Sequence, residues 1–225
     1  MCFSAGASFI GGIVIIGIGV ATITKVHKPM QLVFACIPMF FGIQQIAEGF
    51  VWLALQQPDY IGFLKPATYV FLIMAEVFWP FMVPLATLHM EKNQKKRKML
   101  KILLFMGLAV SMYFIVCLFV CKVTPEIRGY HIQYVDNNPE SLRLIVFGIY
   151  LIASITPFFI SSIKRTYVLG ILMALSCLVT IIFFTQYLTS VWCFFGALLS
   201  IVICWILHTE KRKYKSSYLL INYDK

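Results

Sequence analysis

Residues 32–55 read LVFACIPMFFGIQQIAEGFVWLAL, a stretch whose only acidic or basic side chain is Glu48. A helix that crosses the bilayer core needs about 20 mostly apolar residues. Six other segments have a similar composition: 7–24, 67–89, 102–121, 144–162, 167–187 and 189–207. Irregular backbone cannot face lipid, so each segment is predicted to be helical. The sequence therefore predicts an all-α polytopic membrane protein, a seven-helix transmembrane bundle.

The overall composition agrees with this prediction. Of the 225 residues, 60% are apolar and 12% are charged, whereas a soluble domain has about 25% charged residues. A soluble enzyme is therefore not expected, and the high hydrophobicity also excludes a disordered chain. Seven cysteines in a chain of this length do not indicate a secreted disulfide scaffold.

The distribution of cations predicts the orientation of the bundle. Fifteen of the nineteen Lys and Arg residues follow spans one, three, five and seven, and only Lys65, Lys122, Arg128 and Arg143 lie on the other side. Cytoplasmic loops carry the excess of Lys and Arg. We therefore expect a multi-pass plasma (inner) membrane protein with its N-terminus outside and its C-terminus cytoplasmic. The transmembrane domain would comprise residues 1–208, followed by a basic cytoplasmic tail, residues 209–225.

The net charge of +10 is explained by this topology, because cytoplasmic cations contact anionic lipids. We expect the lipid bilayer as a partner, with anionic lipids at the cytoplasmic face, and no nucleic acid. The only sizeable external segment contains an alternation of apolar and polar residues at 130–134, which predicts a short extended stretch at the outer interface.

Two acidic residues, Glu48 and Glu76, lie inside predicted spans. A charge at the bilayer centre costs about 2.5–3.5 kcal/mol on insertion scales, so such residues face the bundle interior or a cavity. Gln44, Glu48 and Trp52 follow one another at intervals of four residues, and Gln45 lies on a neighbouring line of the same helix. This polar stripe is either helix–helix glue or a ligand or proton site.

Glu76 lies one turn before Pro80, which removes a backbone hydrogen bond to the carbonyl of residue 76 and is predicted to kink the third span. Interrupted helices near the midplane line the binding sites of many transporters. Glu76 has no polar neighbour along its own helix face, so the glue interpretation is the stronger one for this residue.

Sulfur ligands gather towards the outer face, where Cys2, Cys121 and Cys193 are predicted to lie. Disulfides persist on an oxidising side, so Cys2 could pair with Cys193 or Cys121, although each can equally be a small buried apolar residue. His131 is the only histidine expected on this side, and copper or zinc would accept a mixture of Cys2, Cys193, Glu48 and His131. No spacing motif supports a metal, so the cofactor is left open.

Four segments carry a family resemblance: MCFSA at 1–5, QQIAEGFVWL at 44–53, FWPFMVPLA at 78–86 and SVWCFFGALLS at 190–200. Together they resemble an uncharacterised family of small bacterial multi-pass membrane proteins that open with Met-Cys-Phe-Ser. The resemblance spans nearly the whole chain and implies no activity. It singles out these motif positions: Cys2, Ser4, Gln45, Glu48, Trp52, Trp79, Pro80, Trp192 and Cys193.

The leading functional hypothesis is an outward-facing polar pocket built around Glu48 and Gln45, with Cys2 and Cys193 at its rim, that binds a small ligand, a metal or a lipid headgroup. Trp52 and Trp192 are further candidates. One alternative is a proton-coupled small-solute carrier that uses Glu48 and Glu76. Another is a membrane hydrolase or transferase in which Cys2, exposed by removal of Met1, is the nucleophile. The sequence therefore leaves open whether the protein is an enzyme.

Overall fold

The computed structural model describes the backbone of residues 4–135 and 140–223 and the side chains of residues 4–135 and 142–209. Seven stretches of the described residues are helical and are long and apolar enough to cross a membrane. This confirms the predicted all-α seven-helix bundle. The elements are α1 (Ala5–Ile23), η1 (Pro29–Gln31), α2 (Leu32–Ala35), α3 (Ile37–Gln56), η2 (Pro58–Phe63), α4 (Leu64–Leu72), η3 (Ile73–Phe78), α5 (Trp79–Met90), α6 (Gln94–Val120), β1 (Thr124–Arg128), β2 (His131–Val135), α7 (Glu140–Ile160), α8 (Thr166–Phe183), η4 (Thr185–Tyr187) and α9 (Leu188–Tyr223).

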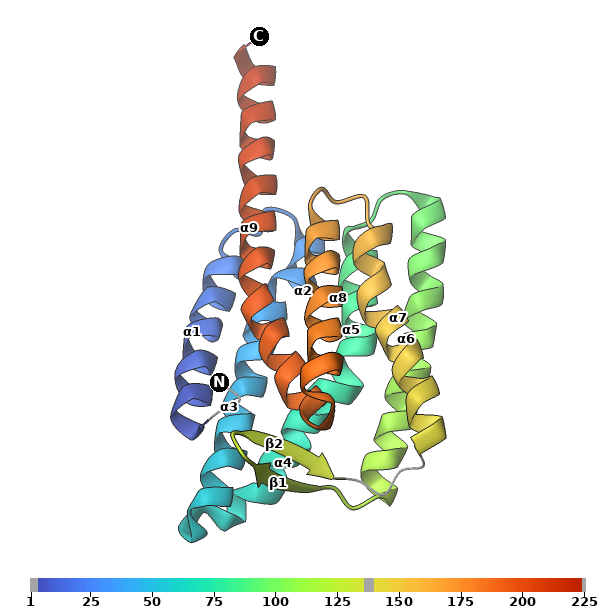
Figure 1. The fold of residues 1–225 in the computed structure, drawn as a ribbon. Helices are drawn as coiled ribbons and strands as arrows, with labels where there is room; N and C mark the ends of the chain where they lie inside the picture. The colour runs from blue at the N-terminus through green and yellow to red at the C-terminus, as the bar shows by residue number, and fades with distance from the viewer. Residues whose placement is uncertain (1–3, 136–139, 224–225) are drawn as a thin grey trace.

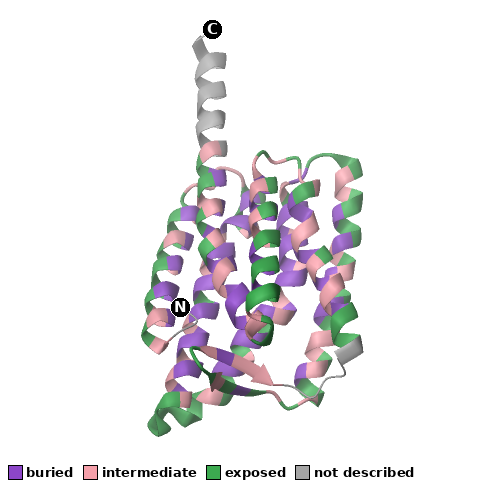
Figure 2. Cartoon of the chain, in the orientation of Figure 1, coloured by how far each residue is buried: buried purple, intermediate pink, exposed green. Residues whose placement is uncertain are grey.

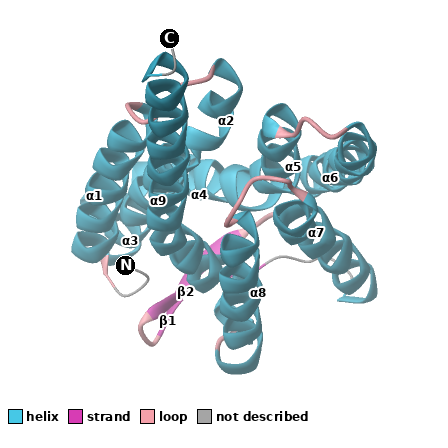
Figure 3. Ribbon diagram, turned by 90° about the horizontal axis from the view of Figure 1, so that it is seen from above, coloured by secondary structure: helices cyan, strands magenta, loops and turns pink. Residues whose placement is uncertain are grey.

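The helices run up and down side by side, and α9 continues well beyond the bundle, so the backbone of the predicted tail extends the last helix to Tyr223 (Figure 1). The second, third and seventh spans are the most enclosed, since 56%, 61% and 56% of their most apolar windows are buried. The other four spans are 28–33% buried and turn exposed faces outward (Figure 2). Seen from above, α1 and α6 lie at opposite edges (Figure 3).

Several helix ends differ from the prediction, and two of them have a local cause in the backbone or in a capping side chain. The sixth span ends at Phe183, four residues early, because Phe184 leaves the helical conformation (φ −137°, ψ 33°) and the Thr185 hydroxyl bonds back to a carbonyl of α8. The fourth span begins at Gln94, eight residues early, because the Asn93 side chain accepts hydrogen bonds from two amides of the first turn. The basic run 95–101 is therefore helical and not a loop.

The third span is interrupted as Pro80 predicts, and the interruption takes the form of a π-helical segment, Ile73–Phe78. Side chains from neighbouring helices bond to carbonyls of this segment. The Tyr150 hydroxyl donates to the Ala75 carbonyl at 2.7 Å, and the Ser111 hydroxyl donates to the Val77 carbonyl at 2.6 Å. Partners from α6 and α7 thus replace regular helical bonding where no water is available.

A glycine allows α6 to approach this segment closely. A Cβ atom added to Gly107 would lie 1.9 Å from the carbonyl oxygen of Pro80, far closer than atoms can approach. Small residues at such crossings let transmembrane backbones pack closely. Gly107 therefore sets the distance between α5 and α6.

The extended stretch predicted at 130–134 is found as β2, which pairs antiparallel with β1. The strands are joined through Gly129, whose φ of 63° lies in the left-handed region that favours glycine. The side chain of Ile132 is fully buried in a cluster with Val51 and Trp52 of α3. The hairpin therefore covers the end of the bundle opposite the C-terminus (Figure 1).

Glu91 joins two connecting segments at the basic end, a role that was not predicted from the sequence. One carboxylate oxygen accepts from the amides of Lys92 (2.9 Å) and Asn93 (2.8 Å). The other accepts from the amide of Ser162, just beyond α7, at 2.6 Å. Burial by itself would raise the pKa of Glu91, but these hydrogen bonds outweigh it and lower the pKa below its ordinary value.

We predict that Gly107→Ala lowers the melting temperature of the detergent-purified protein, because the new methyl group forces α5 and α6 apart at a cost of about 1–3 kcal/mol. Gly148→Ala on α7 is the matched control, since a Cβ there meets nothing within 4 Å. It should be neutral or stabilising by up to about 1 kcal/mol. Equal effects of the two substitutions would contradict the close approach.

We predict that Glu91→Gln destabilises the protein by about 2–3 kcal/mol, because three hydrogen bonds to a charged group are weakened. The pKa is lowered in the folded state, so the stabilisation is complete above the unfolded-state pKa of about 4.3 and is lost as the pH falls further. Melting temperatures measured between pH 7 and pH 3 should therefore converge for wild type and variant. The exposed Glu126→Gln serves as control, and curves that stay parallel would disprove the assignment.

Candidate functional site

The polar stripe of α3 faces the protein interior. Gln44, Gln45 and Glu48 are each 0% exposed, and Trp52 is also buried. Their spacing of three to four residues places them on one side of α3, which is among the most enclosed spans. Glu48 therefore points into the bundle and not towards lipid.

Two other helices contribute partners to this stripe. The Trp79 indole of α5 donates to the side-chain oxygen of Gln44 at 2.8 Å, and the Ser190 hydroxyl of α9 donates to Glu48 Oε1. Gln45 interacts with the Glu48 carboxyl, and the Cys193 thiol lies close to Gln44 and Glu48. The resulting polar core cluster comprises Gln44, Gln45, Glu48, Trp52, Trp79, Ser190 and Cys193.

Several polar atoms of the polar core cluster are buried without a hydrogen-bond partner of good geometry. They are Gln44 Nε2, Gln45 Nε2, Gln45 Oε1, Glu48 Oε2 and Trp52 Nε1. An unpartnered buried polar atom costs about 1–3 kcal/mol, so these five would cost about 5–15 kcal/mol together, as much as the whole stability of a typical domain. A bound molecule or trapped water is the physical remedy.

Within the polar core cluster, the Glu48 carboxyl is the group that is most costly to bury without a partner. Among the described residues, Glu48 forms no ion pair, and the ion pair found there joins Arg128 and Glu126 at the surface. An isolated ionised carboxylate is very costly to bury. Glu48 therefore either keeps a proton or meets a cation or strong donor.

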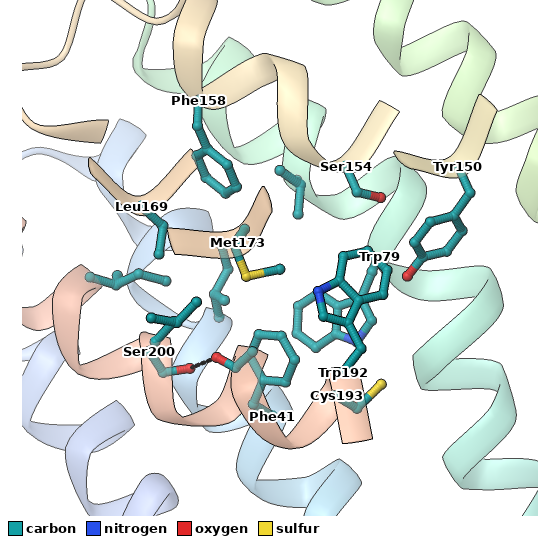
Figure 4. Close-up of a pocket in the computed structure, with 15 residues that line it drawn as sticks. Phe41, Trp79, Tyr150, Ser154, Phe158, Leu169, Met173, Trp192, Cys193 and Ser200 are labelled. Atoms are coloured by element: carbon teal, nitrogen blue, oxygen red, sulfur yellow. Dashed lines mark hydrogen bonds between the residues drawn. The ribbon is translucent and has the colours of Figure 1, made fainter. Parts of the chain in front are cut away.

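An apolar cavity lies beside the polar core cluster. Its empty space, open solvent included, amounts to about 520 Å³, and α3, α5, α7, α8 and α9 all contribute to its lining. Figure 4 shows its aromatic wall, which includes Phe41, Trp79 and Trp192. The Phe41 and Trp79 rings stack with their centroids 3.9 Å apart. Trp79 and Cys193 belong to both the cavity lining and the polar core cluster, so the two features adjoin.

A second, more polar cavity lies nearer the hairpin, and its empty volume is about 340 Å³. We call it the hairpin cavity; it is lined by Leu72, Glu76, Cys117, Leu118, Val123, Tyr134, Arg143 and Thr189. The structure thus brings Glu76 to a cavity that it shares with Arg143. From the sequence alone, Arg143 was expected only to mark the outer side of the membrane.

The predicted metal or disulfide residues are not gathered into one centre within the described part of the chain. There, no three His, Cys, Asp or Glu side chains lie together as a metal-binding group. Cys193 carries a buried free thiol, and Cys121 follows the end of α6. His131 packs against Tyr187, with centroids 4.8 Å apart.

Cys2 lies outside the described residues, so its proposed bridge and its role as a nucleophile stay predictions. Ser190 is the main residue of the site that sequence reasoning missed. A serine near the start of an apolar span was its only signal, because its partner Glu48 is 142 positions away in the chain.

Comparison with known proteins supplies the family and nothing more specific. Residues 1–217 match the family model described as a family of unknown function (DUF6629), which confirms the resemblance to an uncharacterised family. No curated protein and no solved structure matches the chain.

We predict that Gln45→Leu raises the melting temperature of dialysed, ligand-free protein. The change removes two unpartnered atoms, and a gain of about 1–3 kcal/mol corresponds to roughly 2–10 °C in a chain of this size. Gln56→Leu, at the exposed end of α3, is the control and should change little. A clear fall for Gln45→Leu alone would identify the stripe as structural glue between helices.

Proposed function

We propose that the protein, which belongs to this family of unknown function, binds a small ligand inside the membrane at Glu48. Its seven apolar helices make it a multi-pass membrane protein. The ligand would be a small amine or hydroxyl compound, or a lipid headgroup of that kind.

The unpartnered atoms of the polar core cluster are the observation that supports this proposal. Glu48 Oε2 and Gln45 Oε1 can accept hydrogen bonds, whereas Gln44 Nε2 and Gln45 Nε2 can donate them. A molecule with an ammonium or hydroxyl donor and one acceptor oxygen would complement both sets. An ammonium group would also supply the positive charge that the described residues do not bring to Glu48.

The adjoining apolar cavity suits the rest of an amphipathic ligand. Ligand sites are mostly apolar with a few precisely placed polar groups, and here Trp192 and Phe41 provide the apolar wall. Copper or zinc bound between Glu48 and Cys193 is a less favoured occupant, because a metal would need ligands from beyond the described residues.

We also propose that the hairpin end faces outward in the plasma membrane. The connection after α1 contains Lys25 and Lys28, and the connection after α7 contains Lys164 and Arg165. Both connections, and the basic start of α6, lie at the end of the bundle from which α9 extends (Figure 1). The positive-inside rule makes this end cytoplasmic, where the cations and the tail, residues 209–225, would contact anionic lipids.

A proton-coupled carrier is the second candidate. The observation that favours it is the π-helical segment that carries Glu76, since irregular helices near the midplane are typical of transporter sites. Glu48 and Glu76 would then exchange protons with the transported solute. A hydrolase or transferase that uses Cys2 gains no support from the described residues.

The binding proposal is tested by native mass spectrometry of protein released from lipid nanodiscs. We predict that wild type and the surface variant Glu126→Gln retain the same small bound mass, whereas Glu48→Gln loses it because its amide can no longer pair with a cationic donor. A parallel thermal-shift screen with ethanolamine, choline and Zn²⁺ should stabilise wild type but not Glu48→Gln. The proposal would be refuted if wild type retained no bound mass and if no compound in the screen gave a shift that depends on Glu48.

A further inference from the structure

The hairpin cavity places opposite charges together within the membrane-embedded part of the bundle. Glu76 comes from the π-helical segment and Arg143 from the first turns of α7, and both line the same small space. The hydroxyl-bearing residues Tyr134 and Thr189 complete its polar wall. A cavity holds ordered water when it has room and two to four polar groups, whereas apolar cavities stay dry. The hairpin cavity meets this requirement.

The β-hairpin forms the outer wall of this cavity. Tyr134 of β2 stacks on Phe71 of α4 with ring centroids 5.0 Å apart and an interplanar angle of 13°. Two strand positions away, Ile132 is fully buried against the end of the bundle. The hairpin is therefore held against the bundle by the apolar contacts of Ile132 and by the stacking of Tyr134.

The first turn of α9 connects the cavity with the polar core cluster. Thr189 lines the cavity, and the next residue, Ser190, donates its hydroxyl hydrogen bond to Glu48. The first turn of α9 thus contributes one residue to the hairpin cavity and the next residue to the contact with Glu48.

We propose that the hairpin cavity is a hydrated vestibule through which water, and protons carried by it, reach Glu48 from the hairpin end of the bundle. The inference rests on the proposed role of Glu48 as the functional group. Glu76 and Arg143 keep the vestibule polar, and the Thr189–Ser190 step relays hydrogen bonding to the buried carboxyl. The apolar cavity on the other side of Trp79 and Cys193 is not part of this route.

A natural thiol inside the vestibule reports its hydration. Cys117 lines the cavity and is free, whereas the free thiol of Cys177 is buried in the apolar core. A charged, membrane-impermeant methanethiosulfonate forms a mixed disulfide with an accessible thiolate and releases methanesulfinate. Applied to intact cells that express the full chain, it should label Cys117 and spare Cys177, as located by peptide mass spectrometry.

The route is tested by filling the cavity with a larger side chain at position 189. Thr189→Phe should reduce Cys117 labelling to the level of Cys177, whereas Thr189→Ser and the matched control Thr185→Phe, on an exposed residue of η4, should leave it unchanged. Inverted membrane vesicles in which only the opposite face is accessible should give no Cys117 labelling.

Unlabelled Cys117 in wild type from the hairpin side, or undiminished labelling in Thr189→Phe, would overturn the vestibule. Neither labelling result would affect the binding test, in which wild type retains the bound mass and Glu48→Gln loses it. If wild type retains no bound mass, but Cys117 is labelled and Thr189→Phe prevents that labelling, the binding proposal fails and the hydrated cavity remains. The two readouts therefore separate failure of the route from failure of the ligand site.

Discussion

A polar atom in the middle of a bilayer can be hydrogen-bonded only by protein, by a bound molecule or by trapped water. Three polar groups of the third span satisfy this constraint through neighbouring helices. Ser111 and Tyr150 bond to carbonyls of the π-helical segment, and Trp79 bonds to Gln44. These bonds tie α3, η3, α5, α6 and α7 together where hydrophobic attraction between helices is weak.

The polar core cluster satisfies the constraint only in part. The Ser190 hydroxyl donates to one oxygen of Glu48, but the other oxygen and both amide atoms of Gln45 have no hydrogen-bond partner of good geometry. Natural proteins tolerate such costs chiefly at functional sites, where stability is given up for binding or proton transfer. This cost is the reason that we place the proposed ligand site at the Gln44–Glu48 stripe.

The remaining architecture supports this centre. Glu91 joins the segments after α5 and α7 at the basic end, and Gly107 sets the separation of α5 and α6. At the other end the hairpin is packed against α3 through Ile132. The third span, which supplies Trp79, is thus held at the basic end, and the second span, which supplies Glu48, is held at the hairpin end.

The hydrophobic runs and the charge distribution were sufficient to predict seven helices, because span length and loss of water act on each segment locally. The inward direction of Gln44, Gln45 and Glu48 was also predictable, since helical spacing and the cost of polar groups in lipid permit only one side. Tertiary structure alone decided that Glu48 pairs with Ser190 and Gln44 with Trp79. It also decided that Glu76 lines the same cavity as Arg143. These partners are 35 to 142 positions apart or come from different helices, and their distance depends on how helices rotate and cross, which no local pattern encodes. The bond from Ser162 to Glu91 and the unpartnered atoms of Gln45 were hidden for the same reason, because both depend on how segments far apart in the chain pack together.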